Sequence, residues 1–154
     1  MSTKKDKFSK KDKLYMELAL DLAKSREGHT GPNPSVGCVV VKDDKIISIG
    51  QTSPNGRPHA EYNAINNCHE NMEGSKMYVT LEPCAMCAAL IAASRIRRLY
   101  YGASDKKSGG VENGACIFSH SQTHHRPEIY PGICEDEVAK MMTSFFGGLR
   151  RYNS

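Results

Sequence analysis

The segments His59-Ala60-Glu61 and Pro83-Cys84-Ala85-Met86-Cys87 contain one histidine and two cysteines in a pattern suited to binding zinc. Three protein ligands leave the fourth position of a tetrahedral site open, which is typical of a catalytic rather than a structural zinc ion. Glu61 follows the histidine closely, so its carboxylate could move protons near the metal without binding it. We therefore expect one Zn²⁺ per chain and Glu61 as the catalytic residue. The expected zinc ligands are His59, Cys84 and Cys87.

Both segments are expected at the beginning of helices, one running from His59 to about Cys68 and the other from Pro83 to about Ser94. Proline suits the first position of a helix because the N–H that it lacks would be unbonded there. The partial positive charge of a helix N-terminus lowers the pKa of nearby thiols. Cys84 and Cys87 are therefore expected to tend toward the thiolate form that zinc requires.

Two other interpretations of these residues remain open. A structural zinc site would need a fourth ligand, which Cys68 or His69 could supply if the fold brought either one close. A redox-active Cys-x-x-Cys pair would explain Cys84 and Cys87 but would leave His59 without a role.

The composition favours one soluble domain. The chain has 154 residues, of which 39% are apolar and 25% are charged, and its net charge is +4. No apolar run approaches the roughly 20 residues of a membrane span, and the N-terminus has no apolar signal segment. The six cysteines are then best explained as reduced thiols, so we expect a cytoplasmic protein with no membrane association.

The first 13 residues contain six lysines and are expected to form a disordered tail. The domain is expected to span residues 14–154. Hydrophobic periodicity and turn residues predict its elements. Helices are expected over 14–24, 59–68, 83–94 and 136–149, and strands over 36–41, 46–49, 77–81, 96–101 and 128–130. This order indicates an α/β fold in which helices cover both faces of a mixed sheet.

The two segments together form the signature His-x-Glu and Pro-Cys-x-x-Cys of zinc deaminases. On these residues, the chain from about Leu14 to Arg151 resembles the cytidine/deoxycytidylate deaminase superfamily. The resemblance implies a three-layer α/β/α fold with a mixed five-stranded sheet. It also implies a hydrolase acting on C–N bonds of cyclic amidines, in which Glu61 moves protons while an exocyclic amine leaves the ring as ammonia.

The N-terminal half resembles the diaminohydroxyphosphoribosylaminopyrimidine deaminase of riboflavin biosynthesis. The matching stretches run from Thr30 to Val41 and from Gly56 to Glu61. This resemblance implies a small nucleotide-like substrate, with Asn33 in contact with its ring. An asparagine that only bonds its own turn is the alternative for Asn33. The expected substrate-binding residues are Asn33, Ala60 and Pro83.

The C-terminal half resembles bacterial tRNA adenosine deaminases instead. The similarity covers Leu81 to Ala88, Tyr101 to Asp105 and Phe145-Phe146, and the two cysteines lack the insertion usual in the riboflavin family. Thr52 departs from the tRNA deaminases, which usually carry asparagine there. His125 and Arg126 are expected to contact RNA or a substrate phosphate, or else to be loop residues facing solvent.

Residues before the zinc helix bear more on the substrate, because they are expected to shape the pocket that recognises the ring. The first interpretation is therefore the riboflavin-pathway deaminase, and the alternative is a tRNA deaminase that acts on the anticodon loop. A non-catalytic, zinc-stabilised nucleic-acid-binding module is a third possibility, although the presence of Glu61 argues against it. The resemblance also implies a homodimer. Leu90 and Ile91 are expected to lie either in its interface or in the core.

Overall fold

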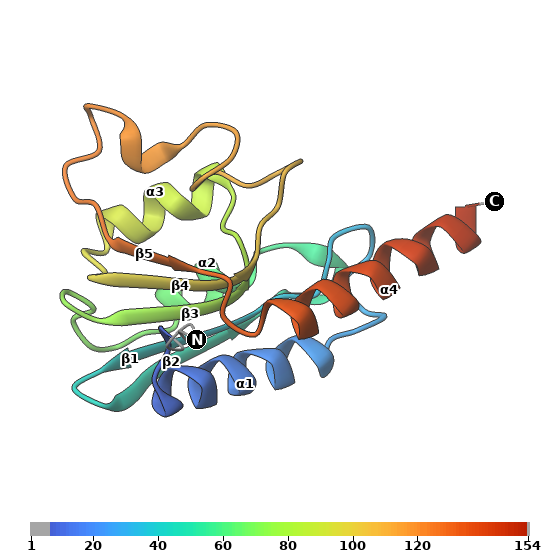
Figure 1. Ribbon diagram of the computed structural model, residues 1–154, viewed down its shortest axis with the longest axis horizontal. Helices are drawn as coiled ribbons and strands as arrows, with labels where there is room; N and C mark the ends of the chain where they lie inside the picture. The colour runs from blue at the N-terminus through green and yellow to red at the C-terminus, as the bar shows by residue number, and fades with distance from the viewer. Residues whose placement is uncertain (1–6, 154) are drawn as a thin grey trace, which may run out of the picture.

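Five strands form one sheet in the order β2-β1-β3-β4-β5 (Figure 1). The computed structural model describes residues 7–153, except for the side chains of 149–153. The strands are β1 (Gly37–Lys42), β2 (Lys45–Gln51), β3 (Lys76–Leu81), β4 (Arg98–Ala103) and β5 (Glu128–Pro131). The α-helices are α1 (Lys10–Lys24), α2 (Ala60–Asn66), α3 (Ala85–Ala93) and α4 (Glu135–Asn153). Two short 3₁₀ helices, η1 (Pro54–Gly56) and η2 (Ile117–Ser119), lie in the loops.

The sheet is mixed, as predicted. β1 is antiparallel to both β2 and β3, whereas β3, β4 and β5 are parallel. Asp43 and Asp44 connect β1 to β2 with φ angles of 51° and 60°. Positive φ at both central residues is the conformation that a tight hairpin turn requires. The two aspartates therefore form the tight turn between the predicted strands 36–41 and 46–49.

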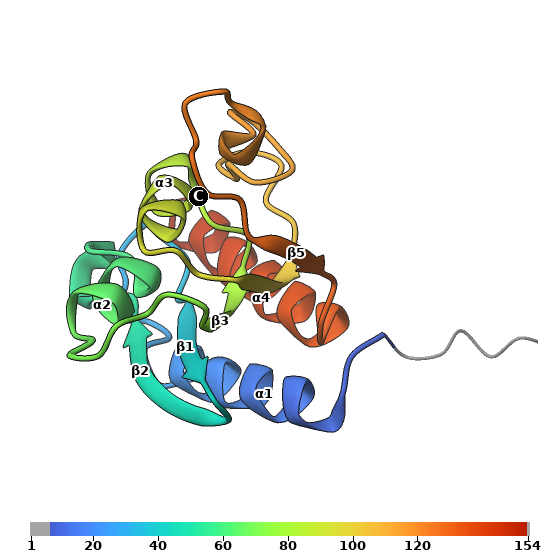
Figure 2. The ribbon, with the colours of Figure 1, turned by 90° about the vertical axis from the view of Figure 1, so that its left-hand side faces the viewer.

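The helices form a layer on each face of the sheet (Figure 2). Helices α1 and α4 cover one face, and α2 and α3 lie on the other. The central strands β1, β3 and β4 are almost entirely buried, as expected for strands covered on both sides. The predicted three-layer α/β/α architecture is confirmed. Beyond the sheet, the second half of α4 projects away from the rest of the chain (Figure 1).

Helix α1 begins at Lys10, earlier than the residue 14 expected from the hydrophobic pattern. The Ser9 hydroxyl accepts a hydrogen bond from the Asp12 N–H, and the Asp12 carboxylate accepts one from the Ser9 N–H, each at 3.0 Å. This reciprocal pair satisfies two N–H groups that a helix start otherwise leaves unbonded. Residues 10–13 thus belong to the helix and not to a tail. Residues 7–9 precede this helix, with Ser9 as its N-cap, and residues 1–6 of the expected tail lie outside the described residues.

Helix α3 also begins at a different residue from the one predicted. Cys84 is its N-cap and Ala85 its first residue, so Pro83 lies outside the helix. The Pro83 carbonyl accepts a hydrogen bond of 2.8 Å from the Gly110 N–H, which holds this part of the chain against the loop after β4. None of the helices in the described part of the chain is both long and apolar enough to span a membrane.

Candidate active site

Two of the predicted zinc ligands are the N-cap residues of neighbouring helices. His59 caps α2 and Cys84 caps α3, both with extended backbone conformations. An N-cap side chain often accepts a hydrogen bond from the first turn of its helix, but neither of these side chains does so. The imidazole and the thiol are therefore available to bind a metal at the positive ends of two helices.

The distances between these side chains fit a tetrahedral zinc site. The Nδ1 atom of His59 lies 3.6 Å from the Sγ atom of Cys84 and 3.7 Å from that of Cys87. Bonds of about 2.05 Å to nitrogen and 2.3 Å to sulfur, at tetrahedral angles, would separate the two ligand atoms by about 3.6 Å. In the described part of the chain, this is the one group of three metal-binding side chains close enough to hold an ion. Cys68, which was considered as a fourth ligand, is not part of this group.

The two thiols and the imidazole perturb one another strongly. The pKa of the Cys84 thiol is lowered, because the Cys87 thiol hydrogen-bonds to its sulfur and His59 also stabilises the thiolate. The pKa of Cys87 is raised, because its proton is shared with Cys84 and its sulfur is buried. A thiolate beside an imidazole is the donor set that zinc prefers.

Glu61 lies in the first turn of α2 and is 4% exposed. Burial raises the pKa of its carboxyl group to about 7, although hydrogen bonding to its own backbone and the charge of His59 act in the opposite direction. A group that titrates near neutrality can both accept and donate a proton. Glu61 therefore has the position and the protonation behaviour expected of a general acid and base.

A cavity of about 390 Å³ opens onto the metal ligands. Its walls come from four parts of the chain: the loop before β1, the loop before α2, the end of β3 with the start of α3, and the loop after β4. Phe146 of α4 adds an aromatic side chain that is 44% exposed. The lining residues outside the metal site are Pro32, Asn33, Pro34, Val36, Thr52, Arg57, Leu81, Glu82, Asp105, Lys107, Ser108 and Phe146.

Asn33, which was predicted to bind the substrate, lines this cavity. Its side-chain amide nitrogen donates a 3.0 Å hydrogen bond to the Gly56 carbonyl, and its backbone carbonyl accepts one of 2.6 Å from the Thr30 hydroxyl. The residue thus holds the loop before β1 and at the same time faces the cavity. Thr52 is similar, because its hydroxyl accepts a hydrogen bond of 2.9 Å from the Val36 N–H while it lines the same wall.

The other predicted contact residues lie outside the cavity lining. The Ala60 side chain is fully buried, so any contact with a substrate would have to come from its backbone. Pro83 is also buried. His125 places Nε2 2.6 Å from the Ile96 carbonyl oxygen, and Arg126 donates a long hydrogen bond to the His120 carbonyl. An RNA contact by these two residues stays a prediction, and it would lie beyond the cavity.

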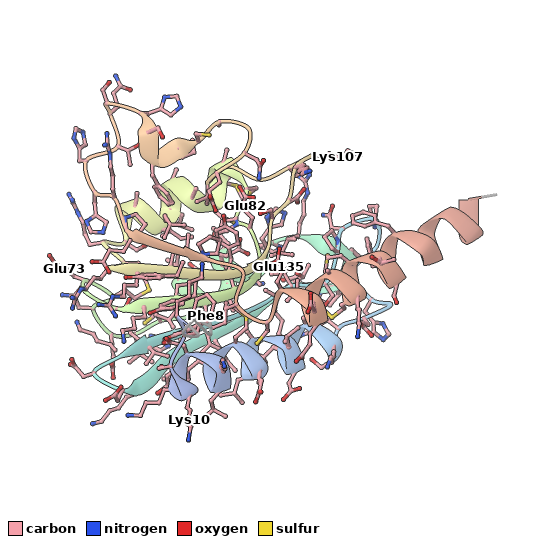
Figure 3. The ribbon with its side chains drawn as sticks, in the orientation of Figure 1. Phe8, Lys10, Glu73, Glu82, Lys107 and Glu135 are labelled. Atoms are coloured by element: carbon pink, nitrogen blue, oxygen red, sulfur yellow. The ribbon has the colours of Figure 1, made fainter. Side chains whose placement is uncertain are left out.

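Sequence reasoning missed four charged residues of the cavity wall, namely Arg57, Glu82, Asp105 and Lys107. Glu82 offered a signal, because a lone carboxylate between a buried strand and a zinc cysteine needs a compensating partner. Figure 3 shows Glu82 near the start of α3 and Lys107 on the loop that follows β4. Their proximity depends on the path of that loop, which local sequence patterns do not specify.

A model of the cytidine and deoxycytidylate deaminase zinc-binding region matches residues 9–103 of the chain. The chain belongs to this deaminase family. It is thus a zinc-dependent hydrolase that acts on C–N bonds, and the metal ligands and Glu61 all fall within the matched region. A purely structural zinc site, a redox pair and a non-catalytic binding module do not account for this match.

The deaminase resembles two groups of characterised relatives. It is 42% identical to a tRNA-specific adenosine deaminase of Agrobacterium fabrum, over 86% of this chain and 91% of the relative. It is 40% identical to the riboflavin biosynthesis protein RibD of Aquifex aeolicus, over 88% of this chain but 38% of the relative. A solved structure from a study of A-to-I editing by tRNA:A34 deaminases superimposes with a TM-score of 0.72 at 40% identity, covering 83% of this chain and 98% of that one.

These matches correct the first interpretation, which assigned the deaminase to riboflavin biosynthesis. The match covers 38% of the length of RibD, but it covers 91% of the length of the tRNA deaminase. The error came from the weight given to the segment from Thr30 to Pro34. Much of the hydrogen bonding of that segment holds the loop itself, so its sequence is a weaker guide to the substrate than expected.

Proposed function

We propose that this deaminase is a tRNA-specific adenosine deaminase, which converts the wobble adenosine of an anticodon to inosine. The observation that carries the proposal is the alignment with the Agrobacterium fabrum tRNA deaminase over 91% of that protein. The solved structure from the study of tRNA:A34 deaminases supports it, because 98% of its chain is covered. The bare two-residue gap between Cys84 and Cys87 is consistent with the same assignment.

The charges around the cavity suit a polynucleotide substrate. Arg57 and Lys107 are exposed residues of the cavity wall, where they could contact phosphates that flank a nucleotide bound inside. Two carboxylates of the same cavity, Glu61 and Glu82, are almost completely buried. The cavity thus has cationic groups near solvent and a buried carboxyl group that can act as acid and base. An enzyme that acts on one nucleobase of an RNA loop requires both.

The proposed chemistry assigns a role to each residue near the metal. His59, Cys84 and Cys87 would hold zinc, which when bound lowers the pKa of water at the open position. The Glu61 carboxylate takes a proton at this position and transfers it to the ring nitrogen next to the reacting carbon. The water oxygen bonds to the reacting carbon as this proton leaves. The Glu61 carboxylate then takes the remaining proton of that oxygen and delivers it to the exocyclic amine, so that the C–N bond breaks, ammonia departs and a carbonyl remains.

Asn33 is proposed to position the base. Since its amide nitrogen is bonded to Gly56, its side-chain oxygen is the group that we assign to the contact. Phe146 is proposed to cover the cavity by stacking on a neighbouring base, because its exposed ring lies at the wall. Both roles follow from position in the cavity, and both can be tested separately from the chemical step.

The homodimer stays part of the proposal. Met86 is 57% exposed at the start of α3, and Tyr62 of α2 is 38% exposed. These side chains and the half-buried Leu90 give the two zinc-bearing helices an apolar outer surface. Ile91, in contrast, is fully buried and belongs to the core of the subunit. Light scattering that gave the mass of a single chain would contradict the dimer.

A cytoplasmic location is likewise proposed. All six cysteines are free thiols in the structure, which suits a reducing compartment. Cell fractionation followed by immunodetection would test this, and recovery of the protein outside the cytoplasmic fraction would contradict it.

The function is tested by incubating the zinc-loaded protein with anticodon stem-loops. Wobble adenosine should be converted to inosine with release of ammonia, while a matched stem-loop with guanosine at the same place should stay unchanged. The diaminopyrimidinone phosphate of the riboflavin pathway serves as a third substrate. Ammonia from that compound in the absence of inosine from the RNA would overturn the proposal. A Glu61→Ala protein that retains its zinc controls for contaminating deaminases.

A further inference from the structure

Glu82 follows β3 directly and lies two residues before a zinc ligand, yet its carboxylate is directed at the loop between β4 and η2. The side chain is 3% exposed and accepts five hydrogen bonds from this loop. The donors to Oε1 are the Asp105 N–H at 3.0 Å and the Asn113 side-chain amide at 2.6 Å. The donors to Oε2 are the N–H groups of Val111 at 3.1 Å, Glu112 at 3.0 Å and Asn113 at 3.2 Å.

These contacts compensate a buried negative charge. All five donors are N–H groups, so they replace the water that burial removes from the carboxylate oxygens. An ionised carboxylate makes stronger hydrogen bonds than a neutral acceptor does. The Glu82 carboxylate is therefore the shared acceptor around which residues 105–113 are organised.

The backbone of the loop closes tightly around this carboxylate. A Cβ atom on Gly109 would lie 2.5 Å from Oε2 of Glu82, and one on Gly110 would lie 2.4 Å from the Ala85 nitrogen. Only glycine allows such close approach to the carboxylate and to the start of α3. The loop has a second attachment, because the Tyr101 hydroxyl hydrogen-bonds to the Glu112 carboxylate.

The segment fixed in this way forms one wall of the cavity. Asp105, Lys107 and Ser108 all line it. The Asp105 carboxylate accepts hydrogen bonds from the N–H groups of Lys107 at 3.1 Å and Ser108 at 2.9 Å. The position of Asp105 therefore determines the positions of these two residues. Because the Asp105 N–H is itself bonded to Glu82, a continuous series of contacts leads from Glu82 to the substrate-facing residues.

We infer that Glu82 is a positioning residue for deamination, which holds residues 105–113 in the arrangement that binds the substrate. It acts through this loop and not through the metal. Loss of the carboxylate therefore weakens substrate binding while the zinc ligands, which lie on α2 and α3, keep their places.

The test compares Glu82→Gln with Glu73→Gln, which removes the same charge from an exposed residue at the left-hand edge of the view, away from Glu82 (Figure 3). For the wobble-adenosine stem-loop, Glu82→Gln should raise KM about tenfold and change kcat by less than about threefold, at unchanged zinc content. Glu73→Gln should leave both constants at their original values. Unchanged KM with a lower melting temperature and a proportionally lower kcat would show a merely structural role and overturn the inference.

Hydrogen exchange gives a second readout that needs no substrate, so it separates this inference from the proposed function. The amides of Val111, Glu112 and Asn113 should exchange faster in Glu82→Gln, while those of β3 and β4 keep their rates. Equal exchange in the loop of both variants would overturn the inference even if the stem-loop were a substrate. If Glu82→Gln failed to fold, Asn113→Ala would remove one donor and should raise KM and loop exchange in the same direction; unchanged values would overturn the inference.

Discussion

The Nδ1 atom of His59 lies 3.6 Å from the Sγ atom of Cys84, although 25 positions separate the two residues in the sequence. The contact exists because α2 and α3 lie side by side on one face of the sheet and each helix has one of these residues as its N-cap. Neither side chain caps its own helix. The metal site is therefore built where two helix starts meet.

Replacement of one ligand should abolish zinc binding. We expect Cys84→Ala to weaken zinc affinity more than about 100-fold, since even the loss of outer hydrogen-bond partners costs about 10- to 100-fold. Metal analysis after dialysis against a weak chelator measures this. Cys68→Ala is the matched control, because this thiol contacts backbone carbonyls of Ile47 and Glu70 and lies outside the metal cluster. Full zinc retention by Cys84→Ala would contradict the assigned ligand set.

Glu61→Gln should separate chemistry from metal binding. Removal of a general acid and base lowers the rate by about 10²- to 10⁴-fold, so kcat should fall by that amount while zinc content stays the same. We also expect a melting temperature at least as high as that of the original protein, because the replaced carboxylate is buried at 4% exposure. The exposed Glu17→Gln controls for the loss of one negative charge. Activity close to the original value would rule out the proposed role.

The metal site could be predicted from the sequence because its signals are local. The histidine and the cysteines stand at helix starts that turn residues and hydrophobic patterns already indicate. All five strands could be placed to within a few residues for the same reason. The start of α1 was missed because Ser9 and Asp12, which cap the helix together, are hidden in a lysine-rich segment that resembles a tail.

The cavity wall and the substrate could not be predicted in the same way. Glu82 and Asn113 are 31 positions apart, and their contact depends on the path of a polar loop without a periodic pattern. Thr52 stands where tRNA deaminases usually carry asparagine, and its hydroxyl accepts a hydrogen bond from the Val36 N–H and so contributes to the scaffold of the site. A residue that both stabilises a loop and lines the cavity is a poor guide to the substrate.

Gly50 should be required for the metal site although it lies on β2. A Cβ atom at this position would be 2.1 Å from the Ala60 carbonyl oxygen and 2.6 Å from the Ala64 nitrogen, so α2 packs directly on the glycine. We expect Gly50→Ala to lower the free energy of unfolding by about 1–3 kcal/mol through overpacking. Because His59 is the N-cap of α2, displacement of this helix should also weaken zinc binding.

Urea unfolding and zinc titration measure the two effects. Gly147→Ala is a control of opposite sign, since this helical glycine has open space around its Cα and alanine there should stabilise the protein by about 0.5–1 kcal/mol. Equal stability of Gly50→Ala and the original protein would show that α2 can move without cost.

Tyr78→Phe should destabilise the protein without changing catalysis. The Tyr78 hydroxyl donates a 2.6 Å hydrogen bond to the Asp12 carboxylate in the core, and the loss of such a bond to a charged group costs about 1.5–3 kcal/mol. Kinetic constants should be unaffected, because neither residue lines the cavity. The exposed Tyr62→Phe is the control.

The effect of Tyr78→Phe should also depend on pH. Burial, followed by the hydrogen bond to Asp12 and the negative charge of that carboxylate, raises the pKa of Tyr78 in the folded protein. A raised pKa gives stability that is complete below the unfolded value, which is about 10, and is lost as the pH rises above it. The stability difference between the two proteins should therefore be constant up to about pH 9 and shrink above pH 10. A difference that grows with alkaline pH would contradict this assignment.

Lys107 and its neighbour Lys106 allow a test of how the cavity recognises RNA. Both side chains are exposed on the same loop, but Lys107 lines the cavity and Lys106 is not among its lining residues. If Lys107 contacts a phosphate, Lys107→Ala should weaken stem-loop binding and reduce the slope of log affinity against log salt by about one. Lys106→Ala changes the net charge equally, so it should alter long-range attraction alone. Equal salt slopes for the two variants would show that general charge, and not a contact at the cavity wall, determines binding.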